Sequence, residues 1–567
     1  MNKIVGIDLG TTNSLVAVVE DGRPRVLERD GQRLIPSVVG RADSGEIIVG
    51  QEALNQYVLA PERTVRSIKR RMGTTEQIKL GDTTYSPEEI SAFILRHLKQ
   101  MAEDILGEKV DRAVITVPAY FNDAQRQATT RAGEMAGLEV VRIINEPTAA
   151  ALAYGVDQQM DQFLLVYDLG GGTFDVSIIE QHGEIMEVRA SHGNVHLGGD
   201  DFDERVLQHL LAHLSGEHRY EFKEDRRAMA RLVRAAERAK TKLSDSPYAK
   251  VIEEFLASYD SQAAHLNTEI EREEFEGMIE DLLGSTIESV HKALEDSGLA
   301  AEQITRVLLV GGSTRIPRVW ELIKNELGIE PSSEINPDEA VALGAAVQAA
   351  IINGDDVQAM LIDVSPHSLG VEVASIIMGE LVPGFYRPII RRNTTIPTTK
   401  SERFFTISPE QDTVEVNAYQ GESQVCVDNT LLGQFKLSGI PPSENPELPR
   451  EVIVEFSYNL NGVVEVAARD RRGERHEMMT VNAATGKRAA SYVETQHHFD
   501  LALEQEIART LEEATTLELK LKTDDNSEDA ELLREARHTL EEAHQQGDEN
   551  QARQAVAAIE DLIYDLG

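Results

Sequence analysis

The chain has 567 residues, of which 41% are hydrophobic and 27% charged, and its formal net charge at pH 7 is −41. This length predicts several domains, roughly three or four. A surface this acidic repels nucleic acid and anionic lipid, which excludes both as main partners.

Cys426 is the only cysteine, so no disulfide can form within the chain, and a reducing compartment is indicated. We interpret it as a small apolar side chain in a strand, not as a nucleophile. The opening residues MNKIVGIDLG lack the apolar core of a signal peptide, and no apolar run approaches about 18 residues. We therefore expect a cytoplasmic protein without a membrane partner.

Up to about residue 355, apolar strands alternate with amphipathic helical stretches, a pattern typical of α/β layering. The predicted strands include 3–7, 114–117, 163–167 and 306–310. The predicted helices include 87–106, 124–136, 228–243 and 272–294. We assign residues 1–355 to one domain and residues 356–364 to a linker. The run DDVQAMLID (355–363) spans this junction.

Residues 365–485 differ, because prolines are frequent and apolar residues alternate. Val454, Phe456 and Tyr458 share one face of a predicted strand, and Asn461-Gly462 fits a type I′ turn before the chain runs back. This pattern predicts an antiparallel β-sandwich. Residues 486–567 contain no proline and show helical apolar spacing, which predicts a short helical bundle.

Two similar loops follow strands 160 residues apart: GIDLGTTNS at 6–14 and YDLGGGTFDVS at 167–177. Glycines allow backbone N–H groups to approach an anion, and the threonines add hydroxyls. An acid beside a phosphate requires a cation between them, and Mg²⁺ bridges carboxylates and phosphate oxygens. One such loop is usually only a hairpin, but two matched copies at domain spacing indicate a polyphosphate clamp.

Other clusters accompany these loops. VGGSTRIP (310–317) follows a strand, and HLGGDDFD (196–203) repeats the Gly-Gly-acid theme. Glu146, after VVRII, is either a helix N-terminal residue favoured by the macrodipole or a carboxylate directed into a cleft. The spacing alone leaves both interpretations open.

Together these segments resemble the seventy-kilodalton heat-shock chaperone family, the DnaK type, over nearly the whole chain. The similar motifs are GIDLGTTNS, VPAYFND (117–123), RIINEPTAAALAYG (142–155), DLGGGTFDVS (168–177), LGGDDFD (197–203), AAERAKTKLS (235–244), VGGSTR (310–315), NPDEAVALGAAVQAA (336–350), SLGVE (368–372), RNTTIPT (392–398) and YQGE (419–422). The short helical end and divergent linker look more like the HscC-like specialised branch.

The resemblance implies a multidomain protein with an actin-like two-lobed α/β ATPase domain, an antiparallel β-sandwich peptide-binding domain and a short α-helical lid. It implies the cofactors ATP or ADP and Mg²⁺, with K⁺ as a candidate second cation. The implied catalytic residues are Lys69, Glu146, Asp168 and Thr173. The implied Mg²⁺ residues, acting largely through water, are Asp8 and Asp175. The implied nucleotide-binding residues are Gly10, Thr11, Thr12, Gly170, Gly171, Gly172, Gly199, Glu237, Lys240, Ser244, Gly311, Gly312, Ser313, Arg315 and Asp338.

The same resemblance implies a chaperone that binds extended apolar segments of unfolded clients, with ATP controlling release and capture. The implied peptide-binding residues are Val371, Val373, Ala374, Phe404, Ile407, Val414 and Val416, each of which could instead be sandwich core. A J-domain partner is implied at Arg142, Asn145 and Asp363. The sequence leaves open whether a nucleotide-exchange factor is needed.

Three features depart from the family pattern: the linker VQAMLID is less leucine-rich, residues 370–393 are longer than the usual strand pair, and the region after 486 is short for a full lid. Two other classes share an actin-like scaffold, small-molecule kinases and filament-forming proteins. Neither needs a β-sandwich followed by helices, so residues 365–567 favour the chaperone.

Overall fold

The computed structural model describes most of the chain before residue 481 and short stretches after it. The described residues are 3–155, 161–217, 222–259, 262–332, 335–355, 357, 359–377, 380–443, 445, 447–460, 462–471, 476–480, 510, 514, 517, 532–534, 536–540, 543 and 549–566. The predicted turn residue Asn461, the linker residues 356 and 358, and the greater part of the predicted lid lie outside these ranges.

The first lobe is built on a mixed sheet with strand order β11-β10-β1-β2-β3, and β4 pairs with β2. The run IVGID of β1 is buried nearly throughout, as expected for a strand covered on both faces. The strands of this sheet are β1 Ile4–Asp8, β2 Asn13–Glu20, β3 Arg23–Val26, β4 Ile35–Pro36, β10 Arg112–Val117 and β11 Glu139–Asn145.

Helices α2 (Pro87–Leu106) and α3 (Asp123–Met135) pack with this sheet in one hydrophobic core. Each begins with a capping box, at Ser86 and Asn122, which satisfies backbone N–H groups at the helix start. The shorter elements of the lobe are β5 Val39–Arg41, β6 Ile47–Val49, α1 Gln51–Tyr57, η1 Pro61–Arg63, β7 Thr64–Val65, η2 Ile68–Arg71, β8 Ile78–Leu80 and β9 Thr83–Tyr85.

The second lobe repeats this plan with strand order β17-β12-β13-β14-β18-β21. In the first lobe β1 pairs antiparallel with β2 and parallel with β10, and here β12 pairs antiparallel with β13 and parallel with β17. The repeated sequence motif is therefore a repeated structural unit. The strands are β12 Gln162–Leu169, β13 Phe174–His182, β14 Ile185–Asn194, β17 Arg306–Val310, β18 Met360–Val364 and β21 Thr395–Ile396.

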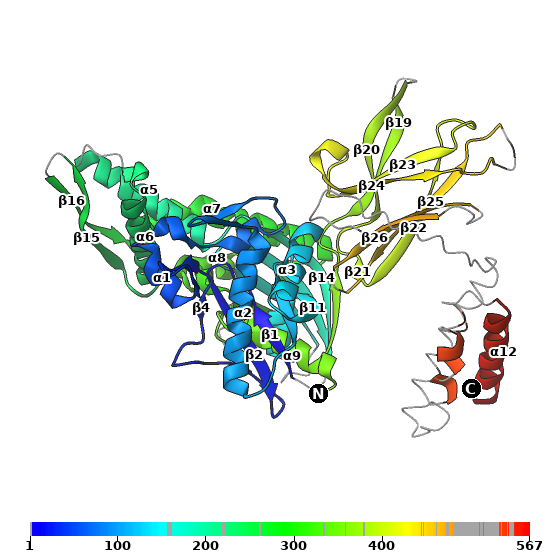
Figure 1. Ribbon diagram of the computed structural model, residues 1–567, viewed down its shortest axis with the longest axis horizontal. Helices are drawn as coiled ribbons and strands as arrows, with labels where there is room; N and C mark the ends of the chain where they lie inside the picture. Colours follow the sequence, from blue (N-terminus) through cyan, green and yellow to red (C-terminus); the bar gives the residue numbers. More distant parts are fainter. Residues whose placement is uncertain are drawn as a thin grey trace.

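Helices α4 (Glu146–Gly155) and α9 (Ala340–Asn353) pack against each other in a core shared with strands of both sheets. The remaining elements of this part belong to the second lobe and include a long hairpin, β15–β16 (Figure 1). They are α5 Gly199–Glu217, η3 Phe222–Glu224, α6 Arg226–Asp245, β15 Tyr248–Tyr259, β16 Gln262–Glu271, α7 Arg272–Ser297, η4 Ala301–Gln303, η5 Gly312–Arg315 and α8 Pro317–Leu327.

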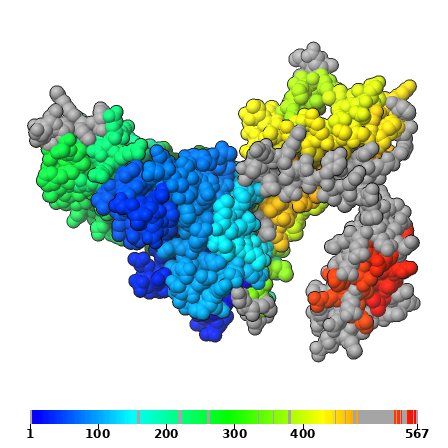
Figure 2. Space-filling view, in the orientation of Figure 1, coloured from blue at the N-terminus to red at the C-terminus, as the bar shows by residue number. Residues whose placement is uncertain are grey.

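The β domain consists of two four-stranded antiparallel sheets, β20-β19-β23-β24 and β22-β25-β26-β27. In β25 buried and half-buried residues alternate, so one face of the strand covers the core. The elements are β19 Leu369–Ile377, β20 Glu380–Ile390, β22 Thr398–Phe405, β23 Thr413–Gln420, η6 Cys426–Asp428, β24 Thr430–Ser438, β25 Glu451–Tyr458, β26 Val464–Asp470 and β27 His476–Thr480. Figure 2 shows this domain, in yellow, beside the blue to green N-terminal part.

The C-terminal helix α12 (Glu549–Leu566) packs with helical residues near 540. Leu533, Leu540, Val556 and Ile559 are buried there, as the apolar spacing predicts, whereas Leu532 is exposed. With its mixed sheets, double β-sheet domain and C-terminal helices, the chain confirms the predicted fold class.

Two local predictions were wrong. Cys426 begins the 3₁₀ helix η6 instead of lying in a strand, although its side chain is buried as expected. In the β25–β26 hairpin Tyr458 pairs with Val464 and the Gly462 amide donates to the Asn459 carbonyl (3.0 Å), so the connection is longer than the two-residue turn predicted at Asn461-Gly462. The Asn459 side chain accepts from the Val463 amide, and this local bond favours the longer loop.

Candidate functional site

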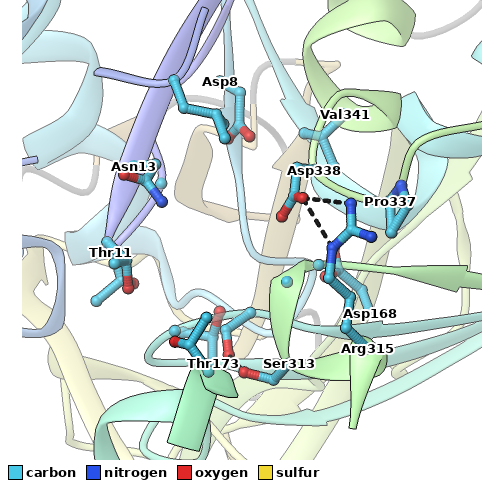
Figure 3. A pocket seen from close by; sticks show the side chains of 18 of the residues that line it. Asp8, Thr11, Asn13, Asp168, Thr173, Ser313, Arg315, Pro337, Asp338 and Val341 are labelled. Atoms are coloured by element: carbon cyan, nitrogen blue, oxygen red, sulfur yellow. Dashed lines mark hydrogen bonds and ion pairs between the residues drawn. The ribbon is translucent and has the colours of Figure 1, made fainter. Parts of the chain in front are cut away.

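A cavity of about 370 Å³ lies between the two lobes. The labelled side chains in Figure 3 ring this cavity, and they come from segments as distant as Asp8 and Val341. The predicted site residues that line it are Asp8, Gly10, Thr11, Thr12, Lys69, Glu146, Asp168, Gly170, Gly171, Thr173, Glu237, Lys240, Ser244, Gly311, Gly312, Ser313, Arg315 and Asp338.

The two glycine loops both line the cavity, and they contact each other at Gly171 and Thr12. A Cβ atom added at Gly171 would lie 1.9 Å from Thr12 Oγ1, a distance that no side chain tolerates. The loop of the first lobe is held by Ser37, whose Oγ donates to the Gly10 carbonyl (2.7 Å). The loop of the second lobe is held by Ser313, whose Oγ donates to the Gly170 carbonyl (2.9 Å). Each loop is therefore held by a hydrogen bond from a serine side chain to a glycine carbonyl.

Lys69 and Glu146 form a buried ion pair on the floor of the cavity. Lys69 lies in η2 and Glu146 is the first residue of α4, so both interpretations of Glu146 hold: it begins a helix and it faces the cleft. The Lys69 ammonium also lies 5.9 Å from the centre of the Phe121 ring. Leaving either charge without its partner would be costly at such a buried position.

Three aspartates, Asp8, Asp168 and Asp175, lie near this ion pair. Burial, followed by repulsion from Glu146, raises the pKa of Asp8 to about 7, and the same two causes raise the pKa of Asp175 to about 7. Burial likewise raises the pKa of Asp168 well above its usual range. Lys69 opposes these shifts at all three aspartates.

The acidic floor fits a divalent cation. Asp168 Oδ2 is buried and has no hydrogen-bond partner among the described residues, and hard oxygen ligands of this kind suit Mg²⁺. No group of three or more His, Cys, Asp or Glu side chains within the described ranges could hold an ion directly. Carboxylates at this spacing suit a cation that keeps its own water shell.

Helix α6 contributes the opposite wall with Glu237, Lys240 and Ser244. Lys240 Nζ donates to the Gly199 carbonyl and pairs with Asp203, both at 2.9 Å. Glu237 pairs with Arg66 of the first lobe at 2.7 Å. Arg315 donates two hydrogen bonds to Asp338 Oδ2, from Nε at 3.0 Å and from Nη2 at 2.7 Å (Figure 3).

Three predicted residues do not line the cavity. Gly172 lies behind the loop contact, against Thr11 and Arg70, and the Gly199 amide donates to the Gly170 carbonyl (3.0 Å). Asp175 lies deeper, where its Oδ1 accepts from the Tyr120 amide (3.0 Å). The lining residues that sequence reasoning missed are Asn13, Leu15, Leu34, Thr241, Asp245, Ile316, Pro337 and Val341. All of these except Leu34 had a signal, since each lies within or directly beside a motif already noted.

The predicted peptide-binding residues are spread over different environments. Val371 and Val416 are buried in the core between the sheets, and Val373, Phe404 and Val414 pack against that core. Ala374 and Ile407 are exposed. Exposed large apolar side chains that were not predicted include Ile376, Leu381 and Phe405.

The three residues predicted to contact a J-domain lie close together. Asn145 Nδ2 donates to Asp363 Oδ2 (2.8 Å), and both residues are buried. Arg142, half-buried in its strand, is close enough to Asp363 for the carboxylate to counteract the fall in the arginine pKa that burial causes. In this arrangement the residues hold the segment after α9 against the end of β11.

A family model described as Hsp70 protein matches residues 4–566 of the chain. Among the described helices, none combines the length and the apolar character needed to cross a membrane.

Proposed function

Because the chain belongs to the Hsp70 family, we propose that it hydrolyses ATP and uses the cycle to bind and release extended hydrophobic segments of client proteins. The family consists of ATP-dependent chaperones that use ATP or ADP with Mg²⁺, bind client polypeptides and work with J-domain partners. The observation that carries the proposal for this chain is the pair of glycine loops facing each other above a buried Lys69–Glu146 pair.

Each part of the cavity has a role in phosphoryl transfer, which depends on positioning and on neutralising charge. Backbone N–H groups of the two loops hold the phosphates, with the hydroxyls of Thr11, Thr12 and Thr173 beside them. Lys69 neutralises charge on the terminal phosphate. Glu146 and Asp168 orient the attacking water and accept its proton. Glu237, Lys240 and Ser244 contact the nucleoside.

Bound Mg²⁺ would supply charge neutralisation between the acidic floor and the phosphates. Asp8 and Asp175 would hold it, largely through water. The raised pKa values of these aspartates and the unpartnered Asp168 Oδ2 support a site that is built for an added cation.

Coupling between nucleotide and client would pass through β18. This strand pairs in parallel with β14, so the predicted linker extends the sheet of the second lobe. The β domain is held nearby by Arg392 and Asn393, which both contact Asp296 of α7, at 2.7 and 3.1 Å. We propose that this docked arrangement is the ATP state, that it opens the client site, and that hydrolysis releases both contacts.

The client site would lie where the β domain exposes apolar side chains. Ile376 and Leu381 flank the tip of the β19–β20 hairpin, and Phe405 and Ile407 lie at the end of β22; all four are exposed. An extended peptide can combine backbone hydrogen bonds at such strands with apolar contacts. Val373, Ala374, Phe404 and Val414 stay as candidate contacts, whereas Val371 and Val416 would support them from the core.

One experiment tests the proposal: the ATPase rate of the full chain, measured with and without an extended hydrophobic peptide and a J-domain. We expect both additions to raise the rate. If neither the peptide nor the J-domain changes the rate, the chain would be a nucleotide hydrolase without coupling to clients, and the chaperone proposal would fail. We further propose that the chain acts in the cytoplasm, belongs to the HscC-like branch, serves a stress response, and uses K⁺ beside Mg²⁺.

A further inference from the structure

Two histidines and a tyrosine pack together where the β domain meets the second lobe. The ring of Tyr120, between β10 and α3, has its centre 4.4 Å from that of His367 and 5.2 Å from that of His192. His192 belongs to β14, and His367 lies between β18 and β19. The ring cluster therefore joins the N-terminal part to the first residues of the β domain.

The hydrogen bonds of the cluster suit neutral imidazoles. His367 Nε2 lies 3.1 Å from the Tyr120 carbonyl oxygen, which can only accept, so this nitrogen carries the proton of the neutral ring. His192 Nδ1 is buried and has no hydrogen-bond partner among the described residues. A proton added at that atom would be buried without an acceptor, which is unfavourable.

Among the described residues, six charged side chains face the cluster from the elements packed against it. They are Arg126 of α3, Asp175 of β13, Lys292 and Asp296 of α7, Arg392 after β20, and Glu422 after β23. Asp296 is paired with Arg392, and Glu422 accepts from the Ser368 amide and hydroxyl (2.8 and 2.9 Å). Asp175 accepts from the Tyr120 amide (3.0 Å). Each of these acids therefore already has a partner, while Arg126 and Lys292 add positive charge close by.

We propose that this ring cluster makes docking of the β domain sensitive to protons: the docked arrangement accepts neutral His192 and His367, and acidification releases the domain. The inference rests on the proposed function in one point, that MgATP favours the docked arrangement, and goes beyond it by making that docking depend on protons. It assigns to His367 and His192 a regulatory role beside the nucleotide site, which the cluster reaches through the hydrogen bond from the Tyr120 amide to Asp175.

The direction follows from proton linkage. Burial, followed by nearby cations, lowers the pKa of both His192 and His367 to about 4, whereas a freely exposed histidine titrates near 6.5. The docked state binds fewer protons than the released state, so docking is fully stable above about 6.5 and is lost as pH falls toward 4. Between pH 7.5 and 5.5 the docked-to-released ratio should fall about tenfold through His367. His192 adds to this fall, since Arg392 and His367 leave it on release.

The test uses the full chain with saturating MgATP. Fluorescent dyes are attached at Glu108→Cys in the first lobe and Glu410→Cys in the β domain, both exposed positions, while the native Cys426 is buried and resists labelling. Energy transfer between the dyes gives the docked fraction from pH 7.5 to 5.5. The parent should lose about tenfold or more of its docked-to-released ratio.

The variant His192→Gln/His367→Gln keeps hydrogen-bond donors but cannot titrate. It should dock at pH 7.5 and lose less than about threefold over the same range. The matched control is His196→Gln, an exposed histidine just after β14, which should keep the fall of the parent. A parent ratio that stays within about twofold, or a double variant that falls as the parent does, would overturn the proposal. If the chain docks normally but ignores clients, only the proposed function fails.

Discussion

Asn145 and Asp363 are 218 residues apart in the chain and share a buried hydrogen bond of 2.8 Å from the amide to the carboxylate. Asn145 ends β11, and Asp363 belongs to β18, the strand that leads into the β domain. Arg126 donates to the same asparagine at its Oδ1 (2.7 Å), which fixes the orientation of the amide. This pair therefore links the two-lobed N-terminal domain to the strand that leads into the β domain.

Asp363→Ala should weaken docking. It leaves the Asn145 amide buried without its acceptor, at a cost of about 1–3 kcal/mol. We expect stimulation of the ATPase by peptide to fall several-fold while basal nucleotide binding is retained, as measured by steady-state hydrolysis and nucleotide titration. Asp412→Ala removes an exposed acid of the β domain and serves as the control. Normal stimulation in Asp363→Ala would show that coupling bypasses this bond.

Lys69→Ala should abolish hydrolysis and leave nucleotide affinity largely intact. The change removes the cation that faces the terminal phosphate and strands Glu146, and losing one such charge costs about 100-fold or more in rate. Single-turnover hydrolysis and equilibrium nucleotide binding separate the two effects. Lys79→Ala, an exposed lysine of the same lobe, should behave as the parent. Near-normal turnover in Lys69→Ala would rule out the assigned role.

Thr173→Ala should bind ATP and hydrolyse it more slowly, by about tenfold, the loss expected for one hydrogen bond in the transition state. The Thr173 side chain is buried at the edge of the cavity. Thr173→Ser retains the hydroxyl and should restore most of the rate. If Thr173→Ala lost nucleotide binding but kept normal residual turnover, the residue would be a binding group instead.

Gly171→Ala should disrupt the contact between the two loops. The added methyl group would lie 1.9 Å from Thr12 Oγ1, and overpacking of this kind costs about 1–3 kcal/mol. We expect nucleotide affinity to fall by about tenfold or more in equilibrium titration. Gly216→Ala in α5, where a Cβ meets nothing within 4 Å, provides the control. Equal affinities in the two variants would mean that the loops do not close on the nucleotide.

The sequence by itself determined the local elements and the duplicated loop. The spacing of apolar residues predicted the observed bounds of α2 and placed β12 and β17 within a residue or two. It could do so because a helix or strand with one buried face carries apolar residues at regular intervals. Strand ends and glycine turns have local signatures, so the residues alone indicated the two glycine loops, whereas Lys69 and the lining residues of α6 were implied only by the family resemblance. The sequence did not predict the loop at Asn459 or the 3₁₀ helix η6. In the loop, the hydrogen bond from the Val463 amide to the Asn459 side chain overrode the strand pattern. In η6, the packing of the buried Cys426 side chain did so.

Only the tertiary structure decided which distant side chains meet. Spacing gave no reason to pair Lys69 with Glu146, and the sequence did not place the Thr12 hydroxyl against Gly171. It also could not separate Val371 and Val416, which are buried, from Ile407, which is exposed, because an apolar residue in a sandwich fits either face until the sheets pack. These relationships depend on the path of the chain between the residues, which local propensity does not specify.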